Sequence, residues 1–308
     1  MKRFWCLFFM FWPLLALYVC WIAPEQGWWF PGTGPATKNY VGPQGGSAMS
    51  PLGQRIDDLF YMILIVTTAT FIFTQIGLGY VLWTGAKRTD PGNKTRAWFS
   101  HGSHNLEVIW SIVPAGILLY IALYQMDVWA EFRMRPFFPN QQINSVLGKV
   151  GVNAEATPGA TQALAEVTAR QFEWRIRYPG FDADGNLLPL MAEPQPTDLY
   201  TVNDLHLPSG APVMINLRSD DVQHSFFLPE LRVKQDAVPG LVIPVWFHAT
   251  ESDTYTLLCA ELCGWGHYKM KARFVAEPAE DWVEWMHELQ EEQNFDGVID
   301  EEEVVDSN

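Results

Sequence analysis

A short segment in the last fifth of the chain concentrates side chains that bind metals. The run CAELCGWGHYKM, residues 259–270, holds two cysteines, one histidine and one methionine, and another histidine lies upstream. The five residues are His224, Cys259, Cys263, His267 and Met270. Two thiolates, two imidazoles and one thioether form a donor set that suits a soft metal ion. The sequence therefore predicts a metal site here.

Three simpler sites compete with a pair of copper ions at these residues. A disulfide between Cys259 and Cys263 would close a very small loop and leave both histidines and the methionine without a role. A zinc site with two cysteines and two histidines would leave Met270 unused, and a mononuclear blue-copper site would leave one cysteine over. Two thiolates that bridge two copper ions use every donor, with one imidazole on each ion and with Met270 and a backbone carbonyl in the weak positions. Because such a site has no open position for a substrate, the pattern favours an electron relay.

The segments around these residues have the pattern of β-strands. From about residue 166 to residue 260, alternating runs such as EVTARQFEWRIRYPG and VIPVWFHA are separated by Gly, Pro and Asp. Alternation with a period of two predicts an antiparallel sandwich or barrel. Residues 134–165 are expected to form a loop or insertion, with a short helix in TQALAEV (161–167). Further on, EPAEDWVEWMHELQ has helical spacing, with four apolar residues on one face: Trp282, Trp285, Met286 and Leu289.

Two long uncharged runs precede the β-rich part. Residues 59–86 and 108–126 contain no Asp, Glu, Lys or Arg. Each run is long enough to cross about 30 Å of hydrocarbon as a helix. Trp110 and Trp129 lie near the ends of the second run, where tryptophans commonly anchor a helix at the membrane interface. Both runs are therefore predicted to be transmembrane helices.

The N-terminus and the loop between the two runs predict the orientation. Residues 1–23, in which two basic residues precede an apolar stretch, resemble a secretory signal sequence that is either cleaved or kept as an anchor. The loop between the runs carries four basic residues: Lys87, Arg88, Lys94 and Arg96. The positive-inside rule places this loop in the cytoplasm. We therefore expect a multi-pass protein of a bacterial plasma membrane, whose soluble domain faces the periplasm or the cell exterior.

Charge is divided unevenly along the chain. The 308 residues include 20 Lys and Arg against 35 Asp and Glu, for a net charge of −15. Residues 1–130 hold 8 basic and 6 acidic side chains, whereas residues 131–308 hold 12 basic and 29 acidic ones. An acidic chain lacks the basic patches that neutralise phosphates, so this balance argues against nucleic-acid binding.

The motifs HSFFLPELRVKQDAVPG (224–240) and CAELCGWGHYKM (259–270), preceded by two helices, resemble subunit II of the haem-copper cytochrome c oxidases. The resemblance spans roughly residues 55–290. It implies a membrane α plus all-β fold, in which a two-helix transmembrane hairpin is followed by an exported cupredoxin-like Greek-key β-barrel. The implied domains are a signal sequence or anchor (1–23), a Gly/Pro-rich linker (24–55), the hairpin (56–130), the cupredoxin-like domain (131–290) and an acidic tail (291–308).

The resemblance also implies a function. A dinuclear CuA centre of two copper ions would accept electrons from cytochrome c or an equivalent donor and pass them to haem in subunit I. Oxygen would be reduced to water there, coupled to proton pumping, so this chain would be a relay and not the oxygen-reducing site. The implied partners are subunit I, the donor and the membrane. The implied ligands are His224, Cys259, Cys263, His267, Met270 and the backbone carbonyl of Glu261.

Four acidic side chains gain a role from the same resemblance. The carboxylate of Glu261 matches a magnesium ligand at the interface with subunit I. Glu107, at the start of the second run, matches a glutamate at the mouth of a proton pathway into subunit I. Asp220 and Asp221 match acids near the cytochrome c docking surface. Each residue also has a simpler explanation. Glu261 would be a surface acid, and Glu107 a carboxylate favoured at the start of a helix. Asp220 and Asp221 would belong to a generally acidic domain.

One motif departs from the family pattern. Family members that accept electrons from cytochrome c usually have QWxW, whose first tryptophan receives the electron, whereas this chain has QFEW with Phe172 and Trp174. Trp174 would then receive the electron in place of the missing tryptophan, or the donor is a membrane-bound cytochrome or another copper protein. A simpler explanation is that both rings belong to the core side of a strand. Two alternative functions remain: the CuA subunit of a nitric oxide reductase, and a metal-free structural subunit of a quinol oxidase, against which the intact ligand set argues.

Overall fold

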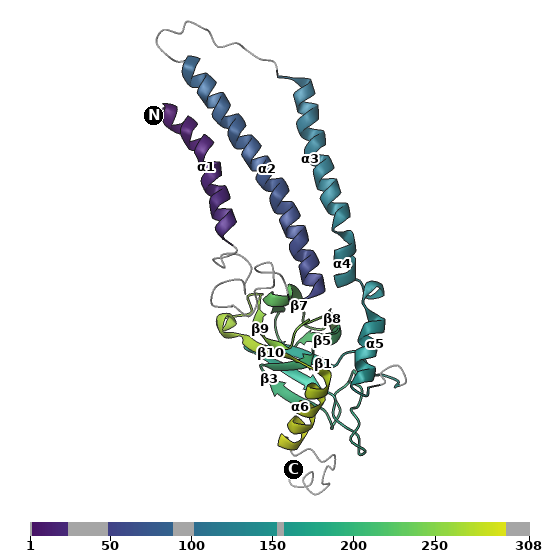
Figure 1. The fold of residues 1–308 in the computed structure, drawn as a ribbon. Coiled ribbons are helices and arrows are strands. Elements are labelled where there is room, and N and C mark those ends of the chain that lie inside the picture. The colour runs from purple at the N-terminus through teal and green to yellow at the C-terminus, as the bar shows by residue number, and fades with distance from the viewer. Residues whose placement is uncertain (1, 24–48, 89–101, 153–156, 294–308) are drawn as a thin grey trace. The chain divides into compact units, whose positions relative to one another are not determined.

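The computed structural model describes residues 2–23, 49–88, 102–152 and 157–293. The chain divides into a helical unit, residues 1–47 and 55–130, and a β unit, residues 48–54 and 131–308 (Figure 1). Most of the predicted linker, the basic loop from residue 89 to 101 and the tail from residue 294 lie outside the described residues.

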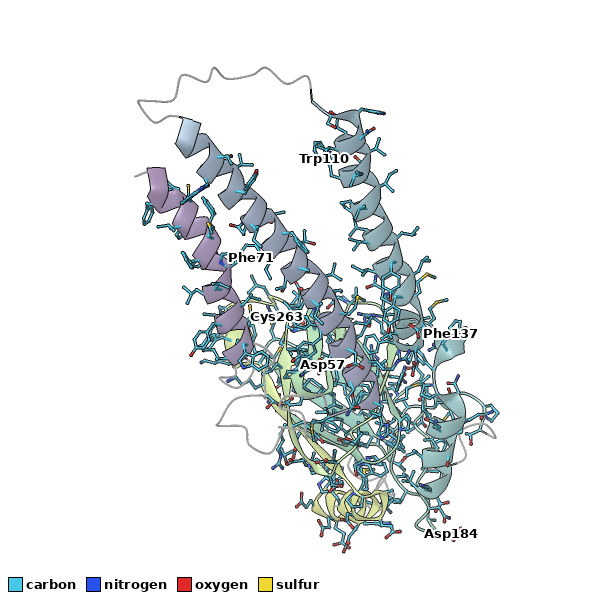
Figure 2. All side chains as sticks on the ribbon, turned by 45° about the horizontal axis from the view of Figure 1, so that its top comes forward. Asp57, Phe71, Trp110, Phe137, Asp184 and Cys263 are labelled. Atoms are coloured by element: carbon cyan, nitrogen blue, oxygen red, sulfur yellow. The ribbon has the colours of Figure 1, made fainter. Side chains whose placement is uncertain are left out.

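Four helices make up most of the helical unit. They are α1 (Lys2–Ile22), α2 (Pro51–Arg88), α3 (His104–Tyr124) and α4 (Met126–Arg133). The first three contain segments that are long and apolar enough to cross a membrane. No residue of α3 is buried, and Phe71 and Trp110 project from α2 and α3 (Figure 2). Apolar side chains that the protein leaves uncovered suit a lipid environment, in which a helix satisfies its own backbone hydrogen bonds.

The start of α2 has an ordinary helix cap. Ser50 precedes the helix, and its hydroxyl oxygen accepts a hydrogen bond from the backbone N–H of Gly53 at 2.9 Å. Pro51 occupies the first helical position, where its missing N–H costs nothing. The helix therefore begins at residue 51, inside the segment that the sequence assigned to the linker.

The β unit contains two five-stranded sheets. One sheet has the order β3-β2-β1-β5-β8 and the other β4-β10-β9-β6-β7. The ten strands that the structure describes are β1 (Ala165–Arg170), β2 (Glu173–Tyr178), β3 (Leu199–Val202), β4 (Asp204–Pro208), β5 (Val213–Ser219), β6 (His224–Leu228), β7 (Val233–Ala237), β8 (Ile243–Phe247), β9 (Asp253–Cys259) and β10 (Lys271–Glu277).

The predicted antiparallel arrangement holds for most pairs of strands but not for all. Strands β1 and β5 pair in parallel, as do β4 and β10, while the other pairs are antiparallel. Alternation of apolar and polar residues is the same in both kinds of pair, so the sequence pattern did not distinguish them. Long connections, not hairpins, join the strands of each parallel pair.

Aromatic residues fill the space between the sheets. Trp174 of β2, Phe226 of β6, Phe247 of β8 and Phe274 of β10 are all essentially inaccessible to solvent. The rings of Phe247 and Phe274 meet edge to face, with centroids 5.5 Å apart. Each fully buried side chain of this size contributes roughly 1.5–3 kcal/mol to the stability of the fold. This core therefore fixes the strands that end at the metal-binding residues.

Two helices accompany the sheets. Helix α5 (Asn140–Lys149) lies in the segment expected to be a loop, whereas residues 161–167, expected to be a short helix, run into β1. The Ala and Leu of that segment favour a helix locally, but its backbone pairs with β5. Helix α6 (Ala279–Glu292) matches the predicted helical spacing, and three of the four apolar residues predicted on its inner face are buried: Trp282, Met286 and Leu289.

A buried ionic cluster that the sequence did not predict joins β1, β2 and the segment before β3. Arg177 donates to Asp198 at 2.6 Å and to Glu166 at 3.2 Å, and also to the carbonyl of Met191 at 3.1 Å. All three charged side chains are almost fully buried. Because a buried charge is tolerated only with partners, these residues depend on one another.

Candidate metal centre

The register of two strands assembles the predicted ligands. Strand β6 begins at His224 and pairs antiparallel with β9, which ends at Cys259. Cys259 lies opposite Phe226, so His224 and Cys259 approach each other at the same end of the sheet. The backbone N–H of Cys259 donates to the carbonyl of Met270 at 3.2 Å, just before β10 begins. This bond closes the loop 260–270 and holds its side chains near His224.

The cluster has two matching halves. The Cys259 sulfur lies 3.9 Å from Nδ1 of His224 and 3.2 Å from the carbonyl oxygen of Glu261. The Cys263 sulfur lies 3.7 Å from Nδ1 of His267 and 3.9 Å from the sulfur of Met270. Each thiol therefore has one imidazole and one weak donor of its own.

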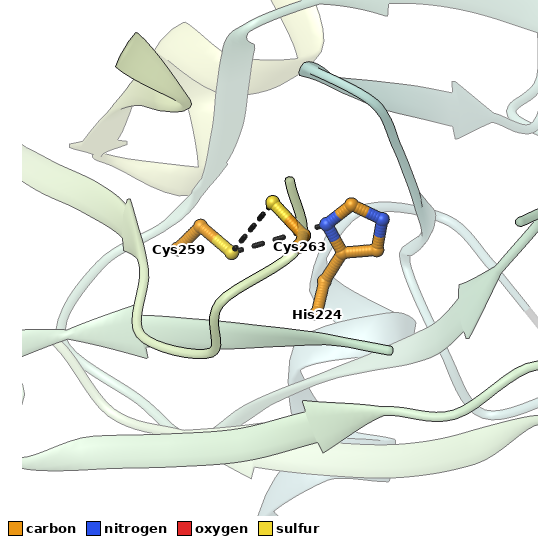
Figure 3. A group of neighbouring side chains, drawn as sticks. All are labelled: His224, Cys259 and Cys263. Carbon is orange, nitrogen blue, oxygen red and sulfur yellow. Dashed lines mark hydrogen bonds between the residues drawn. The ribbon is translucent and has the colours of Figure 1, made fainter. Parts of the chain in front are cut away.

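The two cysteines lie between these halves and are not joined by a disulfide. Their sulfur atoms are 3.9 Å apart, far more than the roughly 2.05 Å of a disulfide, and both thiols are free. Figure 3 shows the two thiols turned toward each other, with the His224 ring beside them. Donor atoms of His224, Cys259 and Cys263 all lie within 4.8 Å of one another and could hold one metal ion together.

The two thiols differ in their readiness to ionise. Burial opposes ionisation of Cys259, but hydrogen bonds from His224 and from the backbone lower the pKa of its thiol to about 6. Burial, and then the negative charge of Cys259, raise the pKa of Cys263 to about 12. One thiolate therefore forms near neutral pH, and the second needs a bound cation, as is usual for metal sites whose loading releases protons.

A carboxylate orients the buried histidine. Nε2 of His224 lies 2.8 Å from Oδ1 of Asp221, which leaves Nδ1 facing Cys259. Burial would lower the pKa of His224, but its contacts with Cys259 and Asp221 raise it. Burial would raise the pKa of Asp221, but the bonds from His224 and from the backbone of Gln171 and Val222 lower it. Such a carboxylate–imidazole pair is the usual support of a metal-binding histidine.

The remaining predicted residues take different positions. Glu261 is half-buried in the loop, and its carbonyl faces Cys259. Asp220 is exposed beside Asp221. Glu107 lies in the first turn of α3 in the helical unit, exposed and 3.9 Å from Nδ1 of His104.

The two aromatic residues of QFEW are not equivalent. Trp174 is fully buried, and its ring centroid lies 6.4 Å from that of His224. Phe172 is half-buried and covers two glycines of the loop: a Cβ on Gly264 would come within 3.1 Å of its ring, and one on Gly266 within 2.5 Å. The Phe172 ring therefore occupies the space that these glycines leave.

Sequence reasoning missed two residues at this site. Gln171 donates from its side chain to the carbonyl of Cys263 at 2.5 Å and from its backbone to Asp221 at 2.7 Å. Trp265, in the middle of the loop, is 80% exposed and meets the Phe172 ring edge to face. A bulky tryptophan between two glycines inside a metal-binding loop was a signal that could have identified Trp265.

Two models of protein families match the chain. A model of the cytochrome c oxidase subunit II periplasmic domain matches residues 163–276, and a model of the transmembrane domain of the same subunit matches residues 42–128. Together the two ranges span about two thirds of the chain. The chain belongs to the cytochrome c oxidase subunit II family. The expected fold class, transmembrane helices followed by a cupredoxin-like β domain, is thereby confirmed.

Individual relatives carry the same description. Cytochrome c oxidase subunit 2 of Thermostichus vulcanus is 26% identical over 278 residues, which cover 80% of this chain and 78% of the relative. An alternative cytochrome c oxidase subunit 2 of Bradyrhizobium diazoefficiens is 35% identical over 181 residues, which cover 51% of this chain and 64% of the relative. The periplasmic domain of subunit II of Bradyrhizobium japonicum cytochrome oxidase overlaps with a TM-score of 0.35 at 21% identity, over 44% of this chain and 97% of that one.

Membership in the family supports a general role. The chain is a membrane protein with a soluble domain, and its relatives are subunits of an oxidoreductase complex. The subunit II family implies copper binding, and the chain has a His/Cys/Cys cluster at which copper could bind.

Proposed function

We propose that this chain is the electron-accepting subunit of a haem-copper terminal oxidase. Its metal centre would take electrons from cytochrome c or an equivalent donor and supply them to haem in subunit I, where oxygen is reduced to water and protons are pumped. The observation that supports this proposal most strongly is the division of the cluster into two halves. Each thiol has its own imidazole and its own weak donor.

The donor set fits two copper ions better than one ion. Six groups would hold the copper pair: the side chains of His224, Cys259, Cys263, His267 and Met270, and the backbone carbonyl of Glu261. A single four-coordinate zinc ion would leave the Met270 sulfur and the Glu261 carbonyl unused, although both lie within 4 Å of a cysteine sulfur. When bound, the copper pair would supply reversible one-electron chemistry.

The fold fixes the positions of this donor set and shields most of it from solvent. The end of β9, the start of β6 and the bond from Cys259 to Met270 fix the positions of both halves. Asp221 holds the His224 ring so that Nδ1 faces the thiols. His224, Cys263 and Met270 are almost inaccessible to solvent. A rigid donor set that is largely shielded from water changes little when the charge on the centre changes, which suits rapid electron transfer.

The remaining assignments form part of the same proposal. The Glu261 carboxylate, half-buried while its carbonyl faces Cys259, would bind magnesium at the interface with subunit I. Glu107 would admit protons to subunit I, and Asp220 and Asp221 would attract a basic donor. The β unit would face the periplasmic side of the bacterial membrane, because the basic residues between the two apolar runs favour the cytoplasm.

Metal analysis of the purified full-length chain tests the proposal. We expect about two copper ions per chain and a mixed-valence EPR signal that His267→Gln abolishes. His248→Gln is the matched control, since His248 belongs to the same β unit but lies outside the cluster, and it should keep the signal. One copper ion, or bound zinc, would refute the dinuclear centre.

Turnover of the intact complex separates the proposed reaction from its alternatives. With reduced cytochrome c as donor, the oxidase should consume oxygen much faster than nitric oxide. The opposite preference would assign the chain to a nitric oxide reductase. A complex without copper in this chain that oxidises quinol would assign it to a metal-free structural role.

A further inference from the structure

The loop 260–270 has an apolar outer surface. Leu262 is 77% exposed, Trp265 80% and Tyr268 69%. Cys263 and Met270 of the same loop are buried, whereas these three large side chains are exposed to solvent. We call Leu262, Trp265 and Tyr268 the loop patch. Exposed apolar side chains of this size on one short loop are typical of a surface that another molecule covers.

Trp265 is held in place by its neighbours. Its ring meets that of Phe172 at a centroid distance of 5.3 Å and an angle of 68°, a favourable edge-to-face geometry. Phe172 in turn rests on Gly264 and Gly266, which flank Trp265 in the chain. The amine of Lys269 lies 5.6 Å from the Trp265 ring. The indole is therefore exposed and yet braced against the metal-binding loop.

Trp265 is also close to the centre along the chain. It lies two residues from Cys263 and two residues from His267, and Cys263 and His267 contact each other at 3.7 Å. The two aromatic residues of QFEW are less suited to meet a donor. Trp174 is fully buried, and Phe172 is half-buried with its ring packed on the loop.

Acidic side chains lie at the same end of the β unit. Gln171 links the two regions, because its backbone N–H donates to Asp221 and its side-chain amide donates to the carbonyl of Cys263. Asp220 and Asp221 are exposed beside this link. Residues 131–308 as a whole hold 29 acidic and 12 basic side chains. Lys269 is a basic residue at the loop patch itself, but the net negative charge of the β unit as a whole favours a positively charged partner.

We propose that Trp265 is the residue through which electrons reach the metal centre, and that the loop patch is the contact surface for a one-electron carrier protein whose own apolar face is ringed by basic residues. This inference rests on the proposed function and names the residue that performs its first step. The reduced carrier loses one electron and becomes oxidised, and the metal centre gains that electron and becomes reduced. The indole bridges the two sites, and no proton or bond is exchanged. An indole is easier to oxidise than a phenyl ring, so Trp265 supplies the group that Phe172 lacks.

The test uses the intact oxidase and a lysine-rich soluble cytochrome c. Stopped-flow mixing measures the second-order rate at which the reduced cytochrome delivers its electron, and surface plasmon resonance measures the Kd of the oxidised cytochrome. Trp265→Ala should lower the rate and weaken binding, each by roughly tenfold or more, as expected for an aromatic anchor at the centre of an interface. Trp265→Phe should recover most of the binding but less of the rate. Tyr200→Ala, at an exposed aromatic on the edge strand β3, should change neither.

Two further readouts separate this inference from a structural role and from the proposed function itself. Copper content and the mixed-valence EPR signal should be unchanged in both Trp265 variants. An unchanged cytochrome rate in Trp265→Ala would overturn the inference. Loss of copper or of subunit I from both variants would also overturn it, because the loop patch would then serve folding or assembly. A wild-type chain without copper would instead refute the proposed function.

Discussion

Replacing Asp221 by Asn should weaken copper binding without unfolding the protein. The Asp221 carboxylate accepts three hydrogen bonds: Oδ1 accepts from Nε2 of His224 at 2.8 Å and from the backbone of Val222 at 2.6 Å, and Oδ2 accepts from the backbone of Gln171 at 2.7 Å. An amide has one oxygen, so its NH2 group must face either the His224 side or Gln171. The variant therefore loses at least one of these bonds and the negative charge that supports His224.

The size of the effect follows from the role of Asp221. Loss of the partner that orients a metal-binding histidine typically costs about 10- to 100-fold in metal affinity, which is roughly 1.4–2.8 kcal/mol. The low end corresponds to an amide oxygen that still faces His224. The high end corresponds to an NH2 group that faces Nε2 and forces the ring to turn.

Competition with a copper chelator measures this change. The chelator concentration that removes half of the copper should fall by the same 10- to 100-fold in Asp221→Asn. Asp220→Asn is the matched control, since it removes the same charge from the neighbouring exposed residue, and it should change that concentration little. Equal effects of the two variants would refute the orienting role and show that only the net charge matters.

Three other predictions concern residues outside the metal-binding loop. Asp198→Ala leaves Arg177 with one fewer buried partner and should destabilise the β unit by about 3–5 kcal/mol in thermal unfolding, whereas the exposed Asp184→Ala should have little effect. Burial would lower the pKa of His206, but carboxylates next to both ring nitrogens raise it above 6.5. The contribution of protonated His206 to the free energy of unfolding should therefore be complete below pH 6.5 and be lost as the pH rises through the higher pKa of the folded state. His206→Gln should flatten this decline in stability with pH. An equally steep decline in the variant would assign the decline to another group. Glu107→Gln should slow oxygen turnover of the intact complex without changing copper content, and unaltered turnover would remove Glu107 from the proton path.

Sequence reasoning was most informative where the signal is local. The ligand types and their spacing lie within one short loop plus His224, and both predicted apolar runs are helical because their length and lack of charge suit no other structure. It failed where the outcome depends on distant partners. Residues 161–167 look helical but enter β1, because their backbone pairs with β5. The parallel pairs of strands were missed for the same reason, since alternation of side chains does not depend on strand direction.

The amino-acid sequence alone predicted which side chains could bind a soft metal, because soft donors must be supplied by specific residue types and these are visible in any sequence. Tertiary structure decided how the donors are shared. The pairing of β6 with β9 brings His224 to Cys259, and the closed loop gives Cys263 its own partners, His267 and Met270. The exposure of side chains was also decided by the fold: Phe172 packs on the loop, and Trp265 remains exposed to solvent. Residue type determines which atoms can bind a metal or conduct an electron, but distance and burial result from contacts between segments far apart in the chain.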